Sequence, residues 1–187
     1  TENVNYRQLL NVKAVSRRMT PPQWFRVTSD TYFNAGALEN LRQVEASCAV
    51  IVTDADLERR GVAAEVQRHL GRMAVHVFAE VEPEPSEARI RAGVETLERM
   101  KPDLLVAVGG GSVIDAAKAM RLFWENPELT LRELGLPFLD ARKRVAQYPK
   151  IAHRVKLVAI PTTAGTGSEV SPASVIAVGK RKVTLVD

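Results

Sequence analysis

Short apolar runs alternate with longer amphipathic stretches along most of the chain. Four of the runs predict β-strands, at residues 49–53, 74–78, 104–108 and 157–160. The stretches between them carry apolar residues at helical spacing and predict helices over residues 57–70, 86–100 and 113–124. This alternation predicts an α/β fold in which a parallel sheet has helices on both faces.

The two ends of the chain depart from this alternation. Residues 1–25 include Pro21 and Pro22, which stop any helix, so we expect a connecting arm there and one domain over residues 26–187. Short strands are expected at residues 24–27 and around 32–33, and a closing pair of strands at residues 175–178 and 183–186. Prolines divide residues 126–154 into short pieces, so we predict no long element in that segment.

Composition and charge exclude several classes of protein. Hydrophobic residues make up 45% of the 187 residues, as in a folded globular chain, and no apolar run reaches the roughly 20 residues of a membrane span. The net charge is +4, and the basic clusters at residues 142–144 and 180–182 lack interleaved aromatic residues, so we expect no nucleic-acid binding.

The single cysteine and the first residues bear on location. Cys48 lies in an apolar run, so we interpret it as a small buried residue in a reducing, cytoplasmic compartment. The N-terminus has no secretory signal pattern and no initiating Met, so we expect a processed chain or a fragment.

A glycine-rich turn follows the strand predicted at residues 104–108. It consists of Gly109, Gly110, Gly111 and Ser112. Glycines let the backbone approach a ligand closely, and the free N–H groups of the next helix favour an anion such as a pyrophosphate. Ser112 is expected to be the N-cap of that helix, with Asp115 completing a Ser-x-x-Asp capping pattern. A tight turn without a ligand is the alternative, but a turn at the carboxyl end of a buried strand favours ligand binding.

Two other loops follow predicted strands and carry polar side chains. Asp54 follows the first strand, where a carboxylate can bind a ribose and repel a 2′-phosphate, which favours NAD over NADP. Capping of the next helix is the alternative for Asp54 and, taken alone, the stronger interpretation. The loop after residues 157–160 contains four hydroxyl side chains, at Thr162, Thr163, Thr166 and Ser168. So many hydroxyls beside two glycines indicate a loop that wraps a ligand.

Three segments together resemble the iron-containing alcohol dehydrogenases: residues 52–54, 109–118 and 159–170. Residues 9–13 and 138–144 look like the linker and an internal segment of bifunctional aldehyde–alcohol dehydrogenases. The resemblance covers almost the whole chain. It implies that residues 26–187 form the Rossmann-like N-terminal, NAD-binding domain of the dehydroquinate synthase-like fold. It also implies an enzyme that interconverts short-chain alcohols and aldehydes by hydride transfer, using NAD and a divalent metal, usually iron.

The resemblance also implies roles for individual residues. Asp54 would hold the adenosine ribose, and residues 109–112 the pyrophosphate, with Asp115 in the same motif. Thr162, Thr163 and Thr166 would line the cofactor, and Lys182 would contact it. Glu84 departs from the family, which more often has Asn or Asp at that position, so a cofactor contact there is in doubt.

The metal site of this family is expected outside the chain. Its ligands, an Asp and three His, lie in an all-helical domain that would follow residue 187, and none of His69, His76 and His153 matches a ligand position. We therefore expect no catalytic or metal-binding residue here, an inactive chain when isolated, and a homo-oligomeric parent enzyme. Two alternatives stay open: a polyol or glycerol dehydrogenase on the same scaffold, and a nucleotide-binding or assembly module without catalysis.

Overall fold

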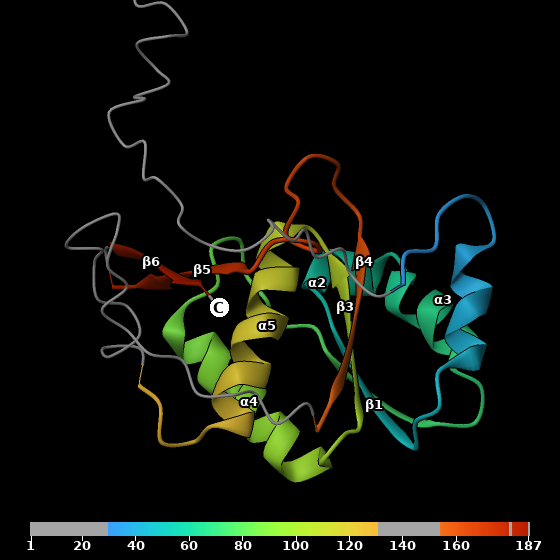
Figure 1. The fold of residues 1–187 in the computed structure, drawn as a ribbon, viewed down its shortest axis with the longest axis horizontal. Helices are drawn as coiled ribbons and strands as arrows, with labels where there is room; N and C mark the ends of the chain where they lie inside the picture. The colour runs from blue at the N-terminus through green and yellow to red at the C-terminus, as the bar shows by residue number, and fades with distance from the viewer. Residues whose placement is uncertain (1–29, 131–153, 180, 187) are drawn as a thin grey trace, which may run out of the picture.

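The computed structural model describes residues 30–130, 154–179 and 181–186 (Figure 1). The predicted arm at residues 1–25 and the predicted strand at residues 24–27 lie outside these ranges. So do the segment at residues 138–144 and most of the proline-divided stretch before it.

Four parallel strands form the main sheet, in the order β2–β1–β3–β4. They are β1 (Cys48–Val52), β2 (Ala74–Phe78), β3 (Leu104–Gly109) and β4 (Lys156–Pro161). All four strand predictions are confirmed. Because β1 pairs with β2 on one side and with β3 on the other, the winding reverses between β1 and β3. The carboxyl ends of these two strands therefore flank a topological switch point, where open α/β sheets bind ligands.

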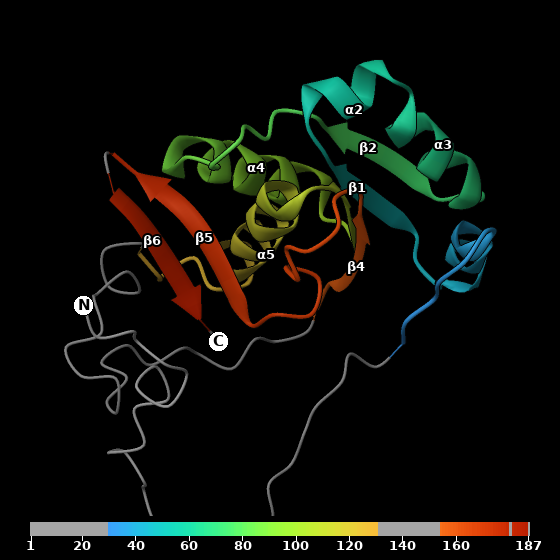
Figure 2. The ribbon, with the colours of Figure 1, turned by 90° about the horizontal axis from the view of Figure 1, so that it is seen from above.

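Helices cover both faces of the sheet, as predicted (Figures 1 and 2). One face carries α4 (Glu87–Met100) and α5 (Gly111–Glu125), and the other carries η2 (Ala37–Gln43), α2 (Ala55–Arg59) and α3 (Val62–His69). Alternate residues of β1 belong to the two cores. Val50 and Val52 pack with α4 and α5, whereas Ala49 and Ile51 pack with α3. The side-chain alternation of a strand thus explains why the run is apolar without a break.

Two local predictions were wrong. The helix predicted over residues 57–70 is divided into α2 and α3, because Gly61 adopts a left-handed conformation (φ 78°) that interrupts the helix. No strand forms at Tyr32 and Phe33, whose side chains are exposed. The chain there turns instead through Gly36 (φ 86°) into η2.

The predicted closing pair of strands forms a separate antiparallel sheet of β5 (Ala173–Val178) and β6 (Arg181–Val186). This sheet lies beside α5 (Figure 2) and contributes the buried side chains of Ile176 and Leu185 to the α4–α5 core. The N–H of Ala177 also donates to the carbonyl of Pro85 (2.9 Å). The small sheet is therefore held against both α5 and the loop that precedes α4.

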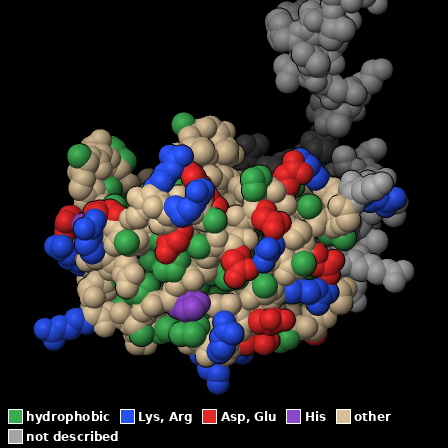
Figure 3. All heavy atoms as spheres, turned by 180° about the vertical axis from the view of Figure 1, so that it is seen from behind, with side chains coloured by type: hydrophobic (Ala, Val, Ile, Leu, Met, Phe, Trp, Pro, Cys, Tyr) green, Lys and Arg blue, Asp and Glu red, His purple; other side chains and the backbone are tan. Residues whose placement is uncertain are grey.

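Charges of both signs are mixed on one face of the molecule. On the face shown in Figure 3, Lys and Arg side chains are interspersed with Asp and Glu side chains, so no broad basic surface faces solvent there. Within the described ranges, no helix combines the length and the apolar character that crossing a bilayer requires.

Candidate functional site

The glycine turn connects β3 to α5 at the switch point. Gly110 has an extended backbone (φ −73°, ψ −176°) and is the N-cap of α5, which begins at Gly111. Ser112 therefore lies in the first turn of the helix, and the predicted Ser-x-x-Asp capping pattern is wrong. The helix begins earlier than predicted because Gly110 itself adopts the non-helical backbone that an N-cap needs.

Three backbone donors at this helix end have no acceptor in the part of the chain that the structure describes. Among the described residues, none accepts a hydrogen bond from the N–H groups of Gly110, Gly111 and Ser112. The carbonyl of Gly110, by contrast, accepts from Val113 (3.0 Å) and Ile114 (3.2 Å). Free N–H groups and the positive end of the dipole of a 15-residue helix together favour an anion at this position.

The hydroxyl-rich loop lies directly against the glycine turn. It leaves β4 with the N–H of Thr162 donating to the carbonyl of Gly109 (3.0 Å). A Cβ atom added at Gly111 would lie 3.0 Å from Ser168 Oγ and 3.2 Å from Thr166 Cβ. A Cβ atom added at Gly110 would lie 3.2 Å from Thr163 Oγ1. The two predicted loops therefore lie together at one position, and their close approach favours residues without a Cβ atom at Gly110 and Gly111.

The end of β1 completes the floor of this site. Thr53, which is fully buried, donates its hydroxyl to the carbonyl of Val108 (2.8 Å) and so ties β1 to β3 across the switch point. Sequence reasoning missed this role of Thr53; a hydroxyl side chain that ends a buried apolar strand is the signal that could have indicated it.

Asp54 follows Thr53 and begins α2. Its Oδ1 accepts hydrogen bonds from the N–H groups of Asp56 (3.0 Å) and Leu57 (2.9 Å), which confirms the capping interpretation. No described residue donates to its Oδ2, so one carboxylate oxygen stays available to a ligand.

Lys182 reaches the same end of α5 from β6. Its ammonium lies 2.7 Å from Glu84 Oε1, and both side chains are exposed. Glu84 has a left-handed backbone (φ 59°), and its N–H donates to Ser112 Oγ at 3.4 Å. The sequence did not predict this pair. The pair brings the positive charge of Lys182 near the first turn of α5. Because an exposed ion pair is weak, Lys182 can exchange Glu84 for another partner there.

Asp115 faces β5. Its Oδ2 accepts from the N–H of Val175 (3.0 Å), and its carbonyl accepts from Ser174 Oγ (2.7 Å). Oδ1 lies 3.4 Å from the ammonium of Lys118. These contacts give Asp115 a structural role, and its assignment to the cofactor group stays a prediction.

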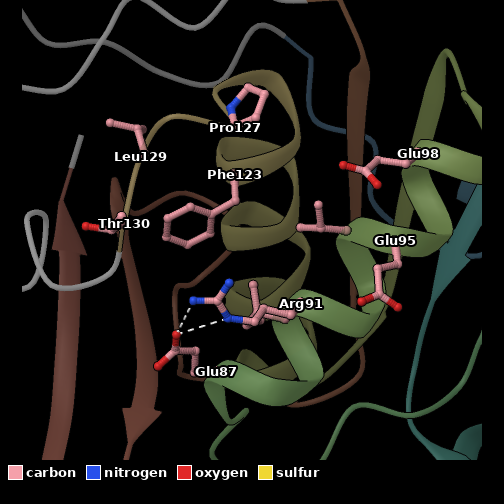
Figure 4. Close-up of a pocket in the computed structure, with 10 residues that line it drawn as sticks. Glu87, Arg91, Glu95, Glu98, Phe123, Pro127, Leu129 and Thr130 are labelled. Carbon is pink, nitrogen blue, oxygen red and sulfur yellow. Dashed lines mark hydrogen bonds and ion pairs between the residues drawn. The ribbon is translucent and has the colours of Figure 1, made fainter.

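A hollow of about 330 Å³ lies elsewhere, between α4 and the end of α5 (Figure 4). Phe123 and Leu129 contribute apolar surface to it, and Glu87 pairs with Arg91 at its rim. None of the predicted cofactor residues lines it, so it is separate from the switch-point site. Across the described ranges, no group of three or more His, Cys, Asp or Glu side chains is arranged to hold a metal ion.

The chain is similar to one protein family, to known sequences and to solved structures. The family model described as iron-containing alcohol dehydrogenase matches residues 28–187. The aldehyde-alcohol dehydrogenase of Streptococcus pneumoniae is 38% identical over 193 aligned residues, covering 100% of this chain and 22% of that protein. The bifunctional aldehyde-alcohol dehydrogenase of Escherichia coli K12 is 39% identical over 182 residues, covering 94% and 20%. An iron-containing alcohol dehydrogenase structure from Thermococcus thioreducens is 32% identical with a TM-score of 0.78, covering 88% and 43%. The chain thus spans about a fifth of the first two relatives and less than half of the third.

Proposed function

Because this chain belongs to the iron-containing alcohol dehydrogenase family, we propose that it is the NAD-binding part of an enzyme that interconverts short-chain alcohols and aldehydes. Its described residues have the Rossmann-like α/β architecture of the N-terminal domain of that family. The observation that carries the proposal is the set of three N–H groups at Gly110, Gly111 and Ser112 without an acceptor among the described residues. They lie at the switch point, beneath a loop rich in hydroxyls.

The residues of the site match the parts of a dinucleotide. The free N–H groups suit the diphosphate, and the Thr163 hydroxyl faces the same turn at Gly110. Thr166 faces Gly111 through its Cβ and methyl carbon, and its hydroxyl accepts from the N–H of Ser168 (3.5 Å). Oδ2 of Asp54 suits the ribose hydroxyls and disfavours a 2′-phosphate. Lys182 adds a positive charge that can leave Glu84 for a phosphate oxygen.

The chain contributes binding and orientation to the reaction. When bound, NAD supplies the acceptor for hydride, and a divalent metal in this family polarises the alcohol oxygen. The described residues include no ligand set for that metal, so the residues proposed here hold and orient the dinucleotide only.

A titration of the chain with NAD and NADP tests the cofactor assignment. We expect NAD to bind at least ten times more tightly than NADP, and Asp54→Asn to reduce that ratio because it removes the repulsive charge. Asp56→Asn is the matched control, since this neighbouring carboxylate pairs with Arg59 and Arg60 on the surface of α2. Absence of binding by either dinucleotide, or a ratio that Asp54→Asn leaves unchanged, would reject the assignment.

An activity assay tests the proposal for the parent enzyme. A longer protein that carries this chain is expected to reduce acetaldehyde with NADH, and to lose that activity when a chelator removes the metal. Turnover of glycerol with no turnover of ethanol would instead favour a polyol dehydrogenase.

A further inference from the structure

The hydroxyl-rich loop between β4 and β5 is held at both of its ends. At its start, Thr162 is bonded to Gly109 at the end of β3. At its other end, the ammonium of Lys118 on α5 donates to the carbonyls of Ser171 (3.2 Å) and Ala173. These partners are more than 50 residues apart in sequence, so the contact joins separate elements of the fold.

Lys118 is enclosed where it makes these bonds. Its side chain is 20% exposed, and that of Asp115, one turn earlier on α5, is 11% exposed. Burial lowers the pKa of the Lys118 amine, and the nearby carboxylates of Asp115 and Glu169 oppose that effect. Glu169 belongs to the loop itself. Part of the negative charge that favours the ammonium form of Lys118 therefore comes from the loop that Lys118 holds.

From this arrangement we propose that Lys118 is a positioning residue, which anchors the carboxyl end of the hydroxyl-rich loop and so keeps Thr166 against the glycine turn. Thr166 and Ser168 precede the anchored carbonyls in this loop, and a Cβ atom added at Gly111 would lie 3.2 Å from Thr166 Cβ and 3.0 Å from Ser168 Oγ. Without the anchor, the described residues still hold the loop at Thr162, at the short turn on Gly167, and just beyond its end, where Asp115 accepts hydrogen bonds from Ser174 and Val175. The short turn is closed by hydrogen bonds from Val170 (3.1 Å) and Ser171 (2.9 Å) to the Gly167 carbonyl. The expected effect on NAD affinity rests on the proposed function, whereas the expected loosening of the loop does not.

Hydrogen exchange of the chain without ligand tests the anchor directly. In Lys118→Met we expect the amides of Val170 and Ser171 to exchange at least ten times faster than in the native sequence. The matched control is Lys156→Met, because Lys156 also donates to a backbone carbonyl, that of Glu45 (2.7 Å), at the amino end of the sheet. Since Lys118→Met leaves Asp115 without its cation, Asp115→Asn/Lys118→Met provides a variant in which both charges are removed together.

NAD affinity supplies the second readout. Lys118→Met is expected to raise the dissociation constant for NAD about tenfold, whereas Lys156→Met leaves it unchanged. Loop exchange that stays at the native rate in the double variant, or that rises equally in Lys156→Met, would overturn the proposal. If the native chain does not bind NAD, the proposed function fails, and the exchange comparison still decides whether Lys118 holds the loop.

Discussion

Replacing Gly111 by alanine separates cofactor binding from folding. The added Cβ atom would lie 3.0 Å from Ser168 Oγ and 3.2–3.3 Å from Thr166, inside the distance of ordinary van der Waals contact. The hydroxyl-rich loop must therefore move away from the start of α5 by a few tenths of an ångström. This displacement of the loop and of the first turn of α5 is expected to disturb the proposed contact between the Gly111 N–H and a phosphate oxygen.

The effect on folding is the balance of two opposing terms. Crowding of this kind costs about 1–3 kcal/mol. Replacing glycine in a helical conformation recovers about 0.4–1 kcal/mol, because alanine loses less backbone entropy on folding. We therefore expect the free energy of unfolding to fall by about 0–2.6 kcal/mol, measured by urea denaturation.

The expected loss of NAD-binding free energy is larger than the expected loss of folding free energy. Loss of one hydrogen bond to a charged phosphate oxygen is worth about 1.5–3 kcal/mol, which corresponds to a rise of about 10- to 150-fold in the dissociation constant for NAD. Calorimetric titration measures this change. Gly93→Ala is the control, because its Cβ would press against the side chain of Met120 between α4 and α5, and the residues it meets do not belong to the loop. It should reduce stability without changing NAD affinity, whereas native NAD affinity in a folded Gly111→Ala protein would refute the reasoning.

Two further substitutions test the electrostatics of the fold and of the site. Burial raises the pKa of Asp103, but hydrogen bonds from Cys48 and Ser47 outweigh that effect and lower it overall. Asp103→Asn should thus cost about 1 kcal/mol of stability at pH 7. Because the pKa of Asp103 is lower in the folded than in the unfolded chain, this difference in stability is fully present above the unfolded pKa of about 3.9 and disappears as the pH falls through the folded pKa. Denaturation of both proteins at pH 7 and at pH 3 measures it. An equal difference in stability at the two pH values would contradict the prediction. Lys182→Met should weaken NAD binding about 3- to 10-fold and reduce the salt dependence of that binding. The free energy of unfolding should change by less than about 1 kcal/mol, since the pair with Glu84 is exposed. Titrations at two salt concentrations measure the effect on binding, and an unchanged salt dependence would argue against a phosphate contact.

The sequence predicted the sheet well because a strand buried on both faces leaves a continuous apolar run. Residues 104–108 illustrate this, since every residue of β3 is buried. The sequence predicted the division at Gly61 poorly, because one glycine within a helical pattern is compatible with an unbroken helix, and only its left-handed backbone marks the break. The start of α5 was misplaced for a similar reason, since Gly110 caps the helix without a side-chain signal.

The loops of the site were predicted one at a time, but their arrangement was not. The contact between Gly111 and Thr166 depends on β4 pairing beside β3, which no local pattern encodes. The same holds for Lys118, whose partners become neighbours only when β5 packs against α5. Residue type and position relative to a strand end were sufficient to select candidates, whereas tertiary packing determines which candidates meet.

The most direct test of the account is an NMR titration of the ¹⁵N-labelled chain with NAD. We predict that the largest chemical-shift changes occur at the amides of Gly110, Gly111 and Ser112, followed by Thr163 and Thr166, and that inorganic pyrophosphate reproduces the first set. Saturable changes centred on the hollow between α4 and α5, or no change at these amides at millimolar NAD, would contradict the claim that the start of α5 binds the diphosphate.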